Sequence, residues 1–121
     1  MIEPLDGFAD NVIAVVCSGH VTKADYDAVL VPAVRKALDQ HKKIRLYYQV
    51  GGDFAGIDAG AMWEDFRIGV EHLSRWERMA VVTDVDWIRH TIRAFSFLMP
   101  GEMRVFPTSE ASQARQWIAE A

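Results

Sequence analysis

Apolar residues recur along this chain with two different spacings, and the shorter spacing predicts five strands. Ile2–Leu5 and Val12–Ser18 are separated by turn-forming residues, so we expect a hairpin. Apolar and polar residues alternate through Ile44–Val50. The continuous apolar run Met79–Thr83 is typical of a strand covered on both faces, and Met103–Phe106 supplies the last strand.

Apolar residues at helical spacing predict four helices between and after these strands. Thr22 and Asp25 resemble a capping box at the start of the first helix. Pro32 lies inside that helix, where it removes a backbone hydrogen bond and should produce a kink near Ala28–Val31. The other three helices are expected over Ala59–Leu73, Trp87–Met99 and the segment after Ser109, with N-caps at Asp58, Asp86 and Ser109.

The order of these elements predicts an α/β fold, β-β-α-β-α-β-α-β-α, in a single domain spanning residues 1–121. Strands that alternate with helices favour a five-stranded mixed, mostly parallel sheet flanked by four helices. The segment Gly51–Asp65 then lies at the carboxyl edge of the sheet, where ligands usually bind in such folds.

The helix Ala59–Leu73 has an apolar side and a charged side. Its predicted inner face consists of Met62, Phe66, Gly69, Val70 and Leu73. On the other side we expect the ion pairs Glu64–Arg67 and Glu71–Arg75. The neighbouring acids Glu64 and Asp65 are about 100° apart around the helix axis, so they are poorly placed as an acid/base couple and indicate a solvated face.

Charge and cysteine content narrow the classes of protein. The formal net charge of −4 disfavours a nucleic-acid-binding protein. Cys17 is the single cysteine and lies in an apolar strand, which excludes an internal disulfide and is typical of a buried thiol in a reducing cytosol. The chain has no recognisable secretory signal and no apolar run long enough for a membrane span. We therefore expect a cytoplasmic protein that is at most peripheral at the inner membrane face.

The familiar catalytic and metal-binding patterns are missing from the sequence. Gly51 and Gly56 have the separation of a phosphate-binding loop, but Ile57 and Asp58 replace the required lysine and hydroxyl residue. No histidine has metal-ligand spacing to another among His20, His41, His72 and His90. The sequence therefore predicts a protein without catalytic residues, cofactor or metal.

The segment Trp87–Met99 is both aromatic and basic in an otherwise acidic chain. Its apolar stripe is Ile88, Thr91, Ile92, Phe95 and Leu98. If this stripe packs on the sheet, some apolar side chains remain beside two arginines, which suits an anionic membrane surface or a partner protein. The alternative is that all of them are core or helix contacts. The expected contact residues are Arg89, Arg93, Phe97, Leu98 and Met99.

A second apolar group predicts a crevice between this helix and the preceding one. An apolar small molecule would bind there, and simple side-chain packing is the alternative. The candidate ligand-binding residues are Phe54, Ile57, Met62, Trp63, Phe66, Trp87, Ile88, Thr91 and Phe95.

Several stretches together resemble the SpoIIAA-like proteins, small bacterial domains related in fold to STAS domains and to the CRAL-TRIO lipid-binding domain. The resemblance runs nearly end to end and implies a five-stranded mixed sheet with four helices. The matching stretches are Asp53-Phe54-Ala55-Gly56, Ala61-Met62-Trp63-Glu64-Asp65, Glu77-Arg78-Met79-Ala80-Val81-Val82-Thr83-Asp84 with Trp87, Glu102-Met103-Arg104-Val105-Phe106 and Ala114-Arg115-Gln116-Trp117.

Two functions follow from this resemblance. Anti-sigma-factor antagonists carry a phosphorylatable serine or threonine after the aspartate that opens this helix, but here Asp58 is followed by Ala59. The CRAL-TRIO likeness favours a non-enzymatic binding domain for an apolar small molecule or lipid, with peripheral membrane contact. The alternative is a STAS-like protein–protein regulator that captures its partner through the loop Gly51–Gly60 and works without phosphorylation. A homodimer is compatible with either function.

Overall fold

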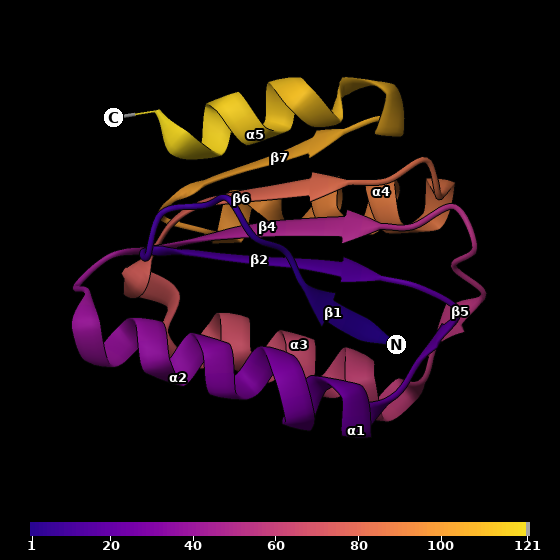
Figure 1. The fold of residues 1–121 in the computed structure, drawn as a ribbon, viewed down its shortest axis with the longest axis horizontal. Helices are drawn as coiled ribbons and strands as arrows, with labels where there is room; N and C mark the ends of the chain where they lie inside the picture. The colour runs from indigo at the N-terminus through magenta and orange to yellow at the C-terminus, as the bar shows by residue number, and fades with distance from the viewer. Residues whose placement is uncertain (121) are drawn as a thin grey trace.

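The computed structural model describes residues 1–120, whose main feature is a five-stranded mixed sheet (Figure 1). The strand order is β1-β2-β4-β6-β7. β1 (Ile2–Pro4) runs antiparallel to β2 (Val12–Cys17). The remaining strands, β4 (Ile44–Val50), β6 (Trp76–Val82) and β7 (Glu102–Phe106), run parallel to β2. The predicted hairpin and the mostly parallel sheet are confirmed.

A short second sheet was not predicted. β3 (His20–Val21) pairs in parallel with β5 (Gly56–Ile57), which joins the loop after β2 to the loop after β4. Two residues are too few to give a periodic signal in a sequence. Gly56 has φ +147°, a conformation that residues with a Cβ rarely adopt.

Helices follow each parallel strand, as expected. Two of them continue into a 3₁₀ turn, so the predicted helices Ala59–Leu73 and Trp87–Met99 end earlier in the structure, at Glu71 and Phe95. The helical segments are α1 (Lys23–Asp25), η1 (Tyr26–Leu30), α2 (Val31–Gln40), α3 (Ala59–Glu71), η2 (Leu73–Arg75), α4 (Asp86–Phe95), η3 (Ser96–Leu98), η4 (Thr108–Glu110) and α5 (Ala111–Ala119).

Pro32 changes the first helix in the predicted region. Thr22 and Asp25 form the expected capping box. The five residues of η1 then form a π-helical turn, in which the N–H of Val31 bonds to the carbonyl of Tyr26. Pro32 has no N–H to donate to the preceding turn, and a wide turn at this point accommodates that loss. Tyr26, at the start of the turn, is buried.

Only one of the three other predicted caps is confirmed. Asp58 accepts a hydrogen bond from the N–H of Ala61, 2.8 Å long, at the start of α3. Asp86 is the first residue of α4 rather than its cap, and Val85 occupies the cap position. Ser109 lies inside η4, so Glu110 precedes α5. Acidic and hydroxyl side chains suit both the cap and the first turn, which is why the sequence misplaced these starts.

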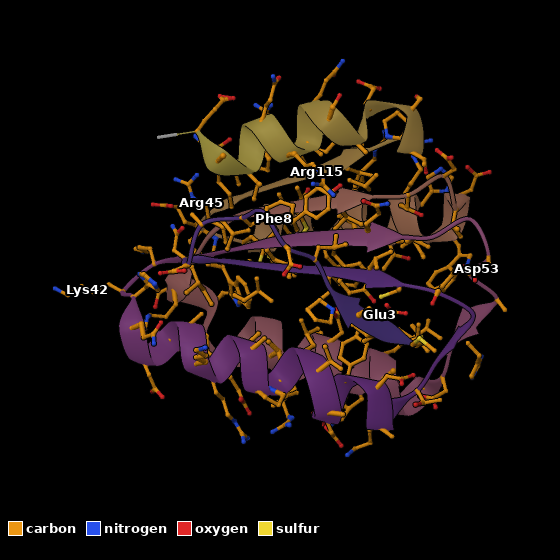
Figure 2. The ribbon with its side chains drawn as sticks, viewed as in Figure 1. Glu3, Phe8, Lys42, Arg45, Asp53 and Arg115 are labelled. Carbon is orange, nitrogen blue, oxygen red and sulfur yellow. The ribbon has the colours of Figure 1, made fainter. Side chains whose placement is uncertain are left out.

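The two faces of the sheet are covered unequally. One face packs against α2 and α3, and α5 covers the other with Ala114, Trp117 and Ile118. Figure 1 shows α5 on the side of the strands opposite α2 and α3. Figure 2 shows Arg115 of α5 beside Phe8, and its guanidinium lies 5.0 Å from the centre of that ring. The α5 face is therefore closed, and the site lies on the other one.

Gly101, between η3 and β7, gives the first testable prediction. A Cβ at this position would lie 2.3 Å from the carbonyl oxygen of Trp76 and 2.6 Å from that of Glu77. Backbone atoms cannot move away cheaply, so we expect Gly101→Ala to lower the free energy of unfolding by about 1–3 kcal/mol. Urea denaturation measures this. Gly52→Ala is the control, because nothing lies within 4 Å of its Cβ. Equal midpoints for the two variants would contradict the prediction.

Candidate functional site

A cavity of about 360 Å³ lies between α3 and α4, against strands β4, β6 and β7. Its volume falls in the range of small-molecule sites, and its wall is predominantly apolar. The wall is built from Tyr26, Leu46, Tyr48, Val50, Phe54, Ile57, Met62, Asp65, Phe66, Gly69, Val70, Leu73, Met79, Val81, Trp87, Ile88, Thr91, Ile92, Phe95, Leu98, Met99 and Met103.

The cavity exists because α3 and α4 do not interlock. In α3 the buried residues are Ala61, Glu64 and Ile68, whereas α4 buries none. Met62 and Phe66, predicted on the inner face, are 47% and 54% exposed. All five residues of the predicted inner face line the cavity, but they do not pack closely, and the apolar sides of both helices remain open.

Most of the predicted ligand-binding residues come together here. Phe54 and Ile57 come from the loop and β5, and α3 adds Met62 and Phe66. Trp63 does not line the cavity. It is 62% exposed and stacks on Phe66 with ring centres 5.9 Å apart. All four residues predicted on α4, Trp87, Ile88, Thr91 and Phe95, line the cavity, and α4 adds Ile92, which was not predicted as a ligand contact.

The residues predicted for membrane or partner contact divide into two groups. Leu98 and Met99 line the cavity instead of lying only on the surface. Arg89, Arg93 and Phe97 are not part of the cavity wall. Phe97 is 79% exposed, the largest value among the exposed apolar side chains, and Arg93 is also exposed.

A cluster of polar side chains interrupts the apolar wall; we call Asp65, Tyr26 and Tyr48 the Asp65 cluster. The hydroxyl of Tyr26 donates to Oδ1 of Asp65 at 3.1 Å. The hydroxyls of Tyr26 and Tyr48 are 2.8 Å apart. The three residues come from η1, β4 and α3, so only the folded chain brings them together.

The surroundings of Asp65 disfavour its charged form. Asp65 is exposed to solvent through the open side of the cavity and is surrounded by protein on its other sides. The resulting desolvation raises its pKa, and the hydrogen bond from Tyr26 partly offsets this. Burial also raises the pKa of both tyrosines, and that of Cys17 to about 11, so these three stay neutral.

The sequence missed Asp65 as a site residue. The expectation that Glu64 and Asp65 form a solvated face was wrong for Glu64, which is buried, whereas Asp65 is exposed but faces the cavity. The Glu64 carboxylate pairs with Arg67 at 2.7 Å, as predicted. The predicted pair of Glu71 with Arg75 was wrong. Glu71 lies 3.4 Å from Arg67, and Arg75 donates to backbone carbonyls instead. Nothing in the sequence indicated that Tyr26 and Tyr48 lie beside Asp65, because they belong to elements far from it along the chain.

Among residues 1–120, no three His, Cys, Asp or Glu side chains gather closely enough to hold a metal ion. None of the helices in the same range has the length and apolarity needed to cross a bilayer.

Asp65 gives a prediction about stability and pH. A raised pKa means that the folded state binds more protons than the unfolded state, so stability falls as pH rises from the ordinary value of 3.8 through the raised one. An asparagine side chain at this position would keep the acceptor for Tyr26 without the charge. We therefore expect Asp65→Asn to melt at a higher temperature than the wild type at pH 7, and the difference to shrink towards pH 4.

Thermal melts at both pH values check this. Asp53→Asn is the matched control, because Asp53 is exposed in the loop after β4, at the edge of the molecule (Figure 2). A lower melting temperature for Asp65→Asn at pH 7 would show that the Asp65 charge is not a cost to the fold.

Comparisons with known proteins agree with this architecture. A family model described as SpoIIAA-like matches residues 12–119. The structure is similar, with a TM-score of 0.72, to that of an uncharacterized protein from the DUF3478 family with a SpoIIAA-like fold from Shewanella loihica PV-4. The two chains are 22% identical, and the alignment covers 98% of this chain and 92% of the other. The search of curated proteins returned no significant match.

The family match spans most of the chain, so the chain belongs to the SpoIIAA-like family. The expected fold is thereby confirmed, and the structural neighbour supports the fold alone. Family and fold together support a regulatory type of domain of a generally non-catalytic class.

Proposed function

From membership of the SpoIIAA-like family and from the open cavity, we propose that this domain binds an apolar small molecule between α3 and α4 and carries out no chemistry on it. The observation that carries the proposal is the open, largely apolar space that runs along one face of the sheet, from Leu46 and Val50 of β4 to Met103 of β7. Small-molecule sites are typically lined in this way by apolar and aromatic side chains with a few polar groups.

The exposed apolar area of the wall provides the driving force. Phe66, Trp87 and Phe95 are 54%, 46% and 52% exposed, although each faces the cavity. Removing apolar surface from water is worth roughly 25 cal/mol per Å², or about 0.8 kcal/mol for each buried CH₂ group. A hydrocarbon ligand covers this wall and gains that energy without any rearrangement of the sheet.

The far end of α4 provides the proposed membrane contact. Phe97 and Arg93 are exposed there, next to Leu98 and Met99 of the cavity wall. An apolar ring beside a cation is the combination that binds the interface of an anionic bilayer. In this proposal the domain collects its ligand from the membrane surface, with Phe97 in the headgroup layer.

A second candidate function is protein-partner regulation through the loop before α3. Phe54 and Ile57 of this loop line the cavity, whereas Asp53 and Ala55 between β4 and β5 are exposed (Figure 2). A partner would bind this loop directly. Recognition would not depend on phosphorylation, because Ala59, at the start of α3, has no hydroxyl to phosphorylate. Failure of the native protein to bind any apolar probe would favour this function over the first.

Filling the cavity tests ligand binding. Gly69 lines the cavity, and nothing lies within 4 Å of a Cβ built there. Leucine is also a better helix former than glycine, so Gly69→Leu should fold. We expect it to weaken binding of the fluorescent probe N-phenyl-1-naphthylamine on the order of tenfold, equivalent to about 1.4 kcal/mol.

Fluorescence titration measures this affinity, and quenching of the tryptophan emission, to which Trp87 of the cavity wall contributes, reports it independently. The control is Ala94→Leu, which places the same side chain on the exposed side of α4, where it does not line the cavity. If Gly69→Leu and Ala94→Leu bind the probe equally well, the probe does not bind in this cavity.

Vesicle flotation tests the membrane contact. We expect the native protein to float with vesicles that contain an anionic phospholipid, and salt to reduce the bound fraction because the contact is electrostatic in part. Phe97→Ala and Arg93→Ala should each reduce binding by more than half. Arg35→Ala, which removes the same charge from the exposed side of α2, is the control. Equal flotation of the Arg93 and Arg35 variants would rule out a specific contact at the end of α4.

A further inference from the structure

We propose that the molecule bound in the cavity is a hydrophobic cation, with an apolar body and a protonated amine that lies against Asp65. This inference rests on the proposed function and specifies the chemical class of its ligand. The hydrogen-bond donors and the charges around the Asp65 cluster support it.

The hydrogen bonds of the cluster form a chain that ends at the Asp65 carboxylate. The single proton of the Tyr26 hydroxyl goes to Oδ1 of Asp65, so Tyr48 donates to Tyr26. Among residues 1–120 the structure gives no donor to the second oxygen, Oδ2, and Asp65 is open to the cavity. The cluster therefore offers the ligand an acceptor.

The charge of Asp65 has no counter-ion in the cavity. The wall contains no lysine, arginine or histidine. Arg67, two residues along α3, is engaged by Glu64 at 2.7 Å and by Glu71 at 3.4 Å. An apolar ligand in the cavity excludes water from the Asp65 carboxylate, which is costly for an unpaired charge. A ligand that carries a cation removes this cost, whereas a neutral ligand leaves it in place.

Aromatic rings strengthen the preference for a cation. Tyr26, Tyr48, Phe54, Phe66, Trp87 and Phe95 all line the cavity. The negative faces of such rings attract ammonium groups, most strongly where water is excluded. A fatty acid would instead bring a second carboxylate to Asp65, which disfavours the common anionic lipids as the occupant.

Three octyl compounds that differ only in their head group test this inference. Octylamine, octanol and octanoate are titrated against the native protein at pH 7, with displacement of N-phenyl-1-naphthylamine as the readout. We expect octylamine to bind on the order of tenfold tighter than octanol, as is typical of a hydrogen bond to a charged group, and octanoate to bind weakest.

Two variants assign the preference to Asp65. Asp65→Asn should bind octanol within about twofold of the native protein but lose the preference for octylamine. Asp53→Asn, which removes an equal charge from the exposed loop, should keep that preference. Asp65→Ala provides the same test if the asparagine variant does not fold.

The outcomes separate this inference from the proposed function. Equal binding of octylamine and octanol, tighter binding of octanoate, or an amine preference that survives in Asp65→Asn would each overturn the hydrophobic cation and leave the cavity as a binding site. If the protein binds neither the three octyl compounds nor N-phenyl-1-naphthylamine, the proposed function fails as well.

Discussion

The site depends on one constraint, which is the order in which successive parallel strands are arranged across the sheet. The order β2-β4-β6-β7 advances one way across the sheet, and each connection between neighbours is a crossover. Crossovers of this kind are right-handed, so a steady advance places all the connecting helices on one face. α2, α3 and α4 therefore share one face, and α5 covers the other by itself.

Helices and strands have different widths, and this explains the incomplete packing of the shared face. Neighbouring strands are about 4.8 Å apart, whereas packed helices need roughly 8–10 Å. Helices that follow successive strands cannot all lie flat on the sheet between them. Here α2 is packed closely, α3 buries Ala61, Glu64 and Ile68, and α4 buries no residue. The cavity is the space that α3 and α4 leave.

The Asp65 cluster is the polar part of an otherwise apolar wall, so the cavity has one polar end and one apolar end. On the α5 face the buried charge of Arg45 has protein partners: it pairs with Glu77 at 2.6 Å and donates to the carbonyl of Ile118 at 2.8 Å. Asp65 has one protein donor and an open oxygen. The first arrangement holds a helix on the sheet, and the second leaves one polar end in an otherwise apolar space.

The sequence by itself determined the strands, the helices and the class of fold, because these follow from local periodicity, caps and turns. It also identified most of the cavity wall, since apolar side chains on α3 and α4 exceed what one packed stripe requires. The tertiary structure alone decided whether those side chains interlock or stay apart, because that depends on helix spacing. It alone also placed Tyr26, Tyr48 and Asp65 together: each lies on a different element, and hydrogen bonds between distant residues have no periodic signal.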